Sequence, residues 1–318
     1  MSESTALDIV VLAGGISHER DVSLRSGRRV ADALTDRGHH VTVLDPGAGL
    51  LSELAARKPD VIWPALHGAT GEDGALRALL ETTGIPFVGS RGAASALAWS
   101  KPTAKELVRR AGYATPESIS LSKETFRDLG AASVLEHVLG ALGMPVVVKP
   151  TKGGSAQGVT IVTATGALPR AMVDAFTYAD VALVENQILG TELAVGVIDS
   201  GDGPVALPAV EIVPVNGVYS FEARYNAGET TFYTPARIDD DVAARVSETA
   251  VAIHSLLGLK HLSRIDLIVD AAGTPWFLEA NVLPGLTETS LVPQAIEASG
   301  QSLGEVYEAL ATAAIIGH

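Results

Sequence analysis

The first third of the sequence alternates short apolar runs with stretches of helical periodicity. The apolar runs are 8–14, 40–44, 60–66 and 85–90, and helical patterns fill the intervals between them. Strands separated by helices predict a parallel, Rossmann-like α/β sheet. Ligands of such sheets bind beyond the carboxyl ends of the strands. The loops GGISHE (14–19) and HGATGEDG (67–74) fall at such ends and are therefore candidate ligand loops.

The pattern changes twice more along the chain, whose 318 residues exceed the needs of one small domain. We predict an N-terminal α/β domain over 1–100 and a central domain over 101–190 that holds a glycine-rich loop. The segment 113–122 is expected to be a linker. From 191 to 318, strands joined by turns and one long helix at 239–257 predict an α+β domain.

Composition excludes several classes of protein. The formal net charge of −14 argues against nucleic-acid binding, which normally needs a basic face. The absence of cysteine removes disulfides, thiolate zinc sites and cysteine nucleophiles. No apolar run approaches the roughly 20 residues of a membrane span, and no signal peptide is readable. We therefore expect a cytoplasmic protein with no membrane or nucleic-acid partner.

Residues 261–285 contain two strand-like runs around a short turn, which predicts an antiparallel hairpin. Side chains alternate between the two faces of a strand. With a four-residue loop, Asp266 lies opposite Glu279 and Arg264 lies opposite Asn281. The other face is expected to be core and carries Ile265, Leu267, Val269, Leu278, Ala280 and Val282.

The paired carboxylates of this hairpin indicate a metal site. Two carboxylates directly opposite each other repel, and a divalent cation would offset the repulsion. The hard oxygen donors of Asp266, Glu279 and Asn281 suit Mg²⁺ or Mn²⁺. The alternative is a solvated strand face on which Arg264 serves as the counter-ion.

A second candidate site lies in residues 144–162, where a glycine-rich loop joins two apolar strands. Glycines let backbone N–H groups approach a phosphate closely, and Lys149 ends the first strand as a possible phosphate contact. The P-loop pattern GxxxxGK[ST] is absent. An ordinary hairpin with a flexible tip is the alternative, but Mg²⁺ commonly bridges carboxylates and nucleotide phosphates, so the nearby metal site favours phosphate binding.

Eight motifs, taken in order, resemble the D-alanine–D-alanine ligase family of ATP-grasp enzymes. They are GGISHERDVSLRSG (14–27), ALHGATGEDG (65–74), SKPTAK (100–105), VVVKPTKGGSAQGV (146–159), VENQILGTELAV (184–195), FEARYNAGETTFYTPA (221–236), SRIDL (263–267) and LEANVLPGLTETSLVP (278–293). The resemblance covers nearly the whole chain. It implies an ATP-grasp architecture in which ATP binds between the central and C-terminal domains, under the glycine-rich loop. It also implies a homodimer that joins two D-alanines through an acyl phosphate, for peptidoglycan precursor synthesis.

The same resemblance implies roles for individual residues at the amino-acid substrates. Glu19 matches the anchor for the ammonium of the first D-alanine, although a glutamate there could instead stabilise the following helix. Arg264 and the backbone N–H of Gly285 match the groups that stabilise the tetrahedral oxyanion. The implied catalytic set is Glu19, Ser155, Tyr225, Arg264, Gly285 and Ser290. The implied substrate-binding set is Glu19, His67, Arg264, Gly285, Ser290 and Leu291.

Further roles are implied at ATP and at the metal. Lys101 and Lys149 match lysines that contact the phosphates. The strand from Glu185 matches the adenine contact, and Glu192 matches the ribose contact. The implied ATP set is Lys101, Lys149, Gly154, Ser155, Glu185, Asn186, Gln187, Ile188, Glu192, Arg224 and Glu279. Two Mg²⁺ (or Mn²⁺) would be held by Asp266, Glu279 and Asn281. The segment 217–236 would be a mobile lid that excludes water.

Several positions depart from the family pattern. Arg224 stands where a lysine is usual, which keeps the charge but changes its geometry. Ala156 and Gln157 alter the glycine-rich loop, and Glu288 and Thr289 replace a common Ser-His before the proposed second-substrate pocket. These changes motivate an alternative, a paralogous ATP-grasp ligase that joins other D-amino acids in specialised metabolism.

Two hypotheses from other classes carry less weight. A nucleotide-binding regulatory protein without catalysis would not need Arg264, Asp266, Glu279 and Asn281 together. A dinucleotide dehydrogenase would need GxGxxG after the first strand, and GGISHE lacks it.

Overall fold

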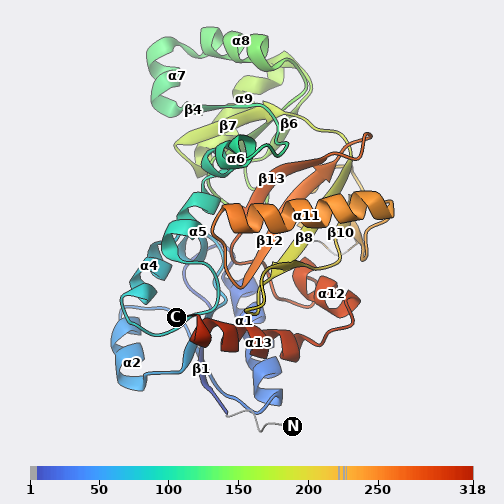
Figure 1. Ribbon diagram of the computed structural model, residues 1–318. Helices are drawn as coiled ribbons and strands as arrows, with labels where there is room; N and C mark the ends of the chain where they lie inside the picture. Colours follow the sequence, from blue (N-terminus) through green and yellow to red (C-terminus); the bar gives the residue numbers. More distant parts are fainter. Residues whose placement is uncertain (1–5, 221–222, 225, 227, 318) are drawn as a thin grey trace.

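The computed structural model describes residues 6–220, 223–224, 226 and 228–317. These residues form three sheets. Figure 1 shows the N-terminal sheet at one end of the molecule, the central sheet at the other, and the C-terminal sheet between them. None of the described helices is both long and apolar enough to cross a membrane.

The N-terminal sheet is parallel, as predicted. Its strands lie in the order β2 (His40–Leu44), β1 (Asp8–Leu12), β3 (Val61–Pro64), connected through α1 (Arg20–Asp36) and α2 (Leu50–Arg57). Ile9, Val10, Val11 and Leu12 are all buried, because a parallel sheet is covered on both faces. The run at 85–90 was expected to be a further strand, but it makes only one bridge, from Phe87 to Ile62. The short helices that follow β3 are α3 (Ala69–Glu72), α4 (Ala75–Glu81), α5 (Gly92–Trp99) and α6 (Lys101–Arg110).

The central sheet is antiparallel, with strands in the order β4 (Ser118–Ser122), β7 (Val181–Asn186), β5 (Val146–Pro150), β6 (Thr160–Val162). It packs against α7 (Lys123–Leu129), α8 (Ala131–Leu142) and α9 (Leu168–Tyr178). The expectation of a linker over 113–122 was wrong for its second half. Ile119 and Leu121 contribute to the core of this sheet, so that half pairs with β7 as β4.

The C-terminal sheet is antiparallel and carries the predicted hairpin. Its strands lie in the order β11 (Thr230–Tyr233), β10 (Val210–Pro214), β8 (Thr191–Ile198), β12 (Leu262–Val269), β13 (Pro275–Asn281), and β9 (Val205–Ala206) pairs with β8. The long helix α11 (Asp240–Leu256) lies across one face (Figure 1). The side chains of Ala104 and Val108 join α6 to the same apolar core.

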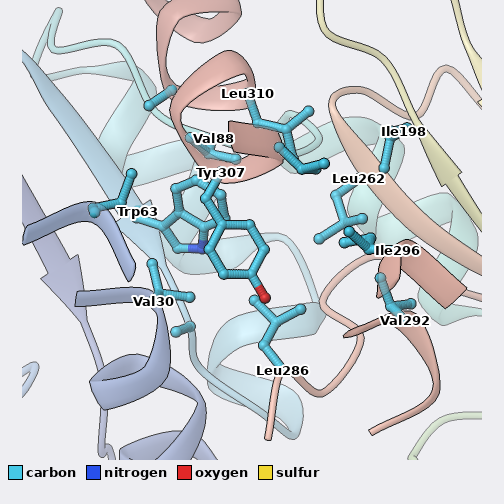
Figure 2. Close-up of a cluster of buried hydrophobic side chains, with 14 of the residues drawn as sticks. Val30, Trp63, Val88, Ile198, Leu262, Leu286, Val292, Ile296, Tyr307 and Leu310 are labelled. Carbon is cyan, nitrogen blue, oxygen red and sulfur yellow. The ribbon is translucent and has the colours of Figure 1, made fainter. Parts of the chain in front are cut away.

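The two ends of the chain share one apolar core. It joins β1, β3 and α1 to the last helices, α12 (Leu291–Ala298) and α13 (Leu303–Ile316). Figure 2 shows Trp63 beside Tyr307 at its centre, with ring centroids 5.2 Å apart. The division into three domains stays a prediction, and this shared core holds the N-terminal loops against the C-terminal hairpin.

Candidate active site

The register of the β12–β13 hairpin confirms the predicted pairs. Asp266 lies opposite Glu279, and Arg264 lies opposite Asn281. A bulge after Asp266 then pairs Leu267 with Phe277. An extra residue in one strand moves the following side chains to the other face, so Phe277 is buried in the core. The prediction that Leu278 faces the core was wrong, because it lines a cavity instead.

Each hairpin carboxylate is paired with a cation. The Nε and Nη2 atoms of Arg264 donate to the two carboxylate oxygens of Asp266, both at 2.7 Å. Lys101 Nζ lies 3.0 Å from Glu279 Oε2. Burial raises the pKa of Glu279, but the positive charges of Lys101, Lys149 and Arg224 outweigh it and lower the pKa to about 2. These cations offset the repulsion between the two carboxylates.

The first cavity, which we call the N-terminal cavity, lies between the N-terminal loops and the hairpin. It brings together every described residue that was predicted to bind or activate the amino-acid substrates. These are Glu19, His67, Ser155, Arg264, Gly285, Ser290 and Leu291. Tyr225 lies outside the described residues. The roles of all these residues stay predictions, but their convergence from five separate motifs makes one polar site.

The second cavity, which we call the central cavity, lies between the central sheet and the same hairpin. It brings together all of the predicted ATP contacts except Ser155. They are Lys101, Lys149, Gly154, Glu185, Asn186, Gln187, Ile188, Glu192, Arg224 and Glu279. Val147, Ile161 and Leu278 add apolar wall, which suits a flat apolar group beside charged ones.

The hairpin forms part of both cavities. Asp266 lines the central cavity, whereas Arg264 and Asn281 line the N-terminal cavity. Glu279, Lys101 and Arg224 line both. A ligand in one cavity is therefore close to a ligand in the other, with the paired charges of the hairpin at their junction.

The glycine-rich loop is tied to the N-terminal cavity. Ser155 Oγ donates a hydrogen bond to Glu19 Oε1, and Lys101 Nζ donates to the carbonyl oxygen of Gly153 at 2.7 Å. Ser155 and Ala156 both have left-handed backbone conformations, with φ of 54° and 55°. Such φ values are uncommon for residues other than glycine, so the loop is held in one tight shape.

His67 is buried and engaged on both ring nitrogens. Burial lowers its pKa, which favours the neutral ring. In that state Nδ1–H donates to the Leu283 carbonyl, 3.1 Å away, and Nε2 accepts from Ser26 Oγ, also at 3.1 Å. Ser26 Oγ in turn accepts the N–H of Leu286 at 3.1 Å. His67 therefore holds the loop around Gly285 in place, and its predicted contact with the first substrate stays a prediction.

Four residues that line a cavity or stand behind its wall were not identified from the sequence. Arg25 lines the N-terminal cavity and pairs with Glu288 at 3.0 Å. Glu72 lines the same cavity as a buried carboxyl, and Tyr219 lines both cavities. Lys105 stands behind the central cavity, 2.8 Å from Glu185. Only Lys105 carried a usable signal, since it falls one helical turn after Lys101 in SKPTAK.

Comparisons with known proteins agree with this geometry. A family model described as D-ala D-ala ligase C-terminus matches residues 107–312, and one described as D-ala D-ala ligase N-terminus matches residues 48–90. The chain is 39% identical over 308 residues to a D-alanine–D-alanine ligase of Anaeromyxobacter sp. strain K, covering 97% of each chain. It is 42% identical over 293 residues to one of Gloeobacter violaceus, covering 92% of this chain and 94% of the relative.

Solved structures give the same result. A D-alanine–D-alanine ligase from Bacillus anthracis complexed with ATP has a TM-score of 0.82 at 26% identity, covering 98% of each chain. The VanG D-Ala:D-Ser ligase from Enterococcus faecalis has a TM-score of 0.83 at 26% identity, covering 98% of this chain and 100% of that one.

Proposed function

The chain belongs to the D-alanine–D-alanine ligase family, and from this premise we propose how its own residues join two D-alanines. The reaction is the ATP-dependent formation of D-alanyl-D-alanine for peptidoglycan precursor synthesis. The observation that carries the proposal is the hairpin at the junction of two cavities. ATP occupies the central cavity and the amino acids occupy the N-terminal cavity, so the phosphate to be transferred meets its acceptor there.

The first step transfers a phosphoryl group to the first D-alanine. Its carboxylate oxygen bonds to the γ-phosphorus of ATP, the bond from that phosphorus to the bridging oxygen breaks, and ADP leaves. Phosphoryl transfer needs positioning and charge stabilisation more than covalent catalysis. Lys101 and Arg224 line both cavities and supply positive charge at the junction. Glu19, fixed by Ser155, holds the ammonium of the first D-alanine.

The second step forms the peptide bond. The amine of the second D-alanine attacks the acyl carbon, phosphate leaves, and the nitrogen releases a proton. Arg264, held in place by both oxygens of Asp266, and the Gly285 N–H face the oxyanion that develops. The carboxylate of the second D-alanine is bound by Ser290 and the first N–H groups of α12, because a helix N-terminus attracts anions.

Two Mg²⁺ or Mn²⁺ ions belong to the same proposal, and the donor set fits them. Asp266, Glu279 and Asn281 offer hard oxygens, and a carboxylate that already holds a cation keeps further lone pairs. Among the described residues, no group of three or more His, Cys, Asp or Glu side chains could hold a metal ion. Beside nucleotides, Mg²⁺ is usually bound by one or two carboxylates, and phosphate oxygens complete its coordination. Bound there, the ions would neutralise the charge of the phosphates.

The lid, the oligomer and the location complete the proposal. Of the segment 217–236, Gly217, Val218, Tyr219 and Arg224 line the central cavity, which supports a lid that closes over ATP. We expect a cytoplasmic homodimer. The net charge of −14 supports the absence of a nucleic-acid partner.

The test is ADP release in ATP and Mg²⁺ with D-alanine, with L-alanine and with D-alanine plus D-serine, each product identified by mass spectrometry. D-alanine should give turnover and D-alanyl-D-alanine, and L-alanine should give neither. ATP binding without D-alanine turnover would overturn the proposal. It would instead favour a ligase for other D-amino acids. The Arg25–Glu288 pair would then be the first site to test for the changed substrate preference.

A further inference from the structure

Three charged side chains form a buried group behind the wall of the central cavity. Lys105 of α6, Glu185 of β7 and Lys149 of β5 have side chains 1%, 2% and 9% exposed. Lys105 Nζ lies 2.8 Å from Glu185 Oε2, and Lys149 Nζ pairs with the other oxygen, Glu185 Oε1. We call these residues the lysine–glutamate cluster.

The cluster carries two positive charges and one negative charge. Because Glu185 is shared, it does not neutralise Lys149 alone, and one net positive charge remains. Lys149 and Glu185 line the central cavity, whereas Lys105 lines neither cavity. Lys105 therefore acts on Glu185 from behind, and the excess positive charge faces the ligand through Lys149.

Helix α6 supplies both contacts that organise this side of the cavity. Residues four apart lie on the same helix face, so Lys101 and Lys105 point the same way. Lys101 reaches Glu279 on β13, and Lys105 reaches Glu185 on β7. One helix thus fixes a carboxylate in each of the two sheets that enclose the central cavity.

We propose that Lys105 is a positioning residue for ATP, which shares Glu185 with Lys149 and so keeps the Lys149 ammonium available to the anionic nucleotide. This inference rests on the proposed function, because it takes ATP as the ligand of the central cavity. Lys105 itself touches no substrate.

The charge states of the two lysines agree with this division of roles. Burial lowers the pKa of Lys105 to about 8; Glu185 raises it, while Lys149 and Arg109 lower it further. For Lys149 burial lowers the pKa, but the carboxylates of Glu185, Glu279 and Glu192 together outweigh burial, and the pKa is raised. As the pH rises, Lys105 therefore loses its proton first, and the cluster loses its net positive charge while Lys149 stays protonated.

The experiment compares charge counts in the cluster. Lys105→Met lowers the net charge from one to zero, and Lys105→Met combined with Glu185→Gln restores it to one. A charged hydrogen bond is worth about tenfold in affinity, so Lys105→Met should raise KM for ATP and the Kd of ATP measured by calorimetry about tenfold. The same Lys105→Met change made in a Glu185→Gln background should leave the Kd of ATP as it is in Glu185→Gln alone, and any direct contact of Glu185 with ATP cancels in this comparison. KM for D-alanine should stay unchanged in both.

The matched control is Arg109→Met, one turn further along α6, because Arg109 pairs with Glu106 and Glu117 outside the cluster. It should leave ATP affinity unchanged. Lys105→Arg, which keeps the charge, should retain affinity as well. A merely structural role for Lys105 would lower the melting temperature without a selective rise in KM for ATP.

A pH series further separates a positioning role of Lys105 from a merely structural role. From pH 7 to 9 the Kd of ATP should rise about fivefold more in the unaltered protein, in which Lys105 loses its proton, than in Lys105→Arg or the double variant. Glu192, whose pKa burial raises to about 7, titrates in all of these proteins and forms a common background. Unchanged ATP affinity in folded Lys105→Met, or an equal loss on adding Lys105→Met to Glu185→Gln, would overturn the inference. Calorimetry needs no turnover, so a failure of the ligase assay remains a separate result.

Discussion

The lysine–glutamate cluster and the hairpin carboxylates are both groups of buried charges beside the central cavity, but they are balanced differently. In the cluster a single carboxylate is held between two lysines, and its side chain is 2% exposed. On the hairpin the two carboxylates have one cation each, and the side chains of Asp266 and Glu279 are 10% and 26% exposed. The cluster meets only the central cavity, through Lys149 and Glu185, and is otherwise enclosed by the protein, whereas the hairpin lines both cavities.

This difference separates two uses of buried charge. A closed group must be satisfied within the fold, because an unpaired buried charge is strongly destabilising. An open group can exchange protein partners for phosphate and metal during a reaction. We therefore expect changes in the cluster to affect stability and ATP affinity, and changes in the hairpin to affect turnover.

The largest expected effect is on turnover at the hairpin. Asp266→Asn removes the carboxylate that orients Arg264 and should lower kcat about 1000-fold, since a preorganised electrostatic contact is worth about 10²–10³ in rate. The melting temperature should fall as well, because Arg264 loses its buried partner, so kcat is measured at a temperature where the variant is folded. The control is Asp270→Asn at the end of the same hairpin, where the carboxylate accepts hydrogen bonds from Ala272, Thr274 and Trp276. Equal losses of kcat in the two variants would contradict the assignment.

The next effect is on stability at the cluster. Glu185→Leu leaves two buried lysines without their shared partner, and breaking a buried pair in this way costs about 3 kcal/mol or more. Urea unfolding should show this loss. Glu117→Leu, at an exposed glutamate that pairs with Arg109, should change the free energy of unfolding by less than about 1 kcal/mol. A loss at Glu185 no larger than at Glu117 would show that the cluster is not closed.

Glu72 tests a third arrangement, a buried carboxyl kept neutral. Burial and the nearby charge of Glu19 raise its pKa from 4.5 to about 8, against the opposing effects of the Gly68 N–H, Arg264 and Lys101. The folded state thus keeps a proton that the unfolded chain releases, and this contribution to stability is lost as the pH rises from 4.5 to about 8. Glu72→Gln removes this pH-dependent loss, so between pH 5 and 8 the variant should gain about 3 kcal/mol of unfolding free energy relative to the unaltered protein. If the free energies of unfolding of the two proteins differ by the same amount at pH 5 and at pH 8, the raised pKa of Glu72 is contradicted.

The smallest expected effect is at the exposed pair of Arg25 and Glu288, whose side chains are 54% and 64% exposed. A double-mutant cycle with Arg25→Ala and Glu288→Ala should give a coupling in the free energy of unfolding below about 1 kcal/mol, because water screens exposed pairs. A coupling well above this value would show that the pair behaves like a buried ion pair and is not screened by water.

The sequence predicted the parts of the site that depend on local periodicity. Alternation along two strands was enough to place Asp266 opposite Glu279. It could not predict the bulge, because Phe277 and Leu278 are both apolar and either could face the core. Glu185 was predicted at the cavity, but its sharing between two lysines was not. The spacing in SKPTAK puts Lys105 on the same helix face as Lys101, but its burial depends on Glu185 of β7, far along the chain.

The contact between Trp63 and Tyr307 also has a consequence for how the protein is made. The ribosome synthesises β3 long before α13, and α13 begins at a capping box formed by Ser302 and Glu305. The core around Trp63 therefore stays incomplete until α13 has been translated. Contacts between distant parts of a chain are slow to form, and unburied apolar surface favours aggregation. A nascent chain that stalls before α13 would thus present its first sheet uncovered on that side, as a client for chaperones.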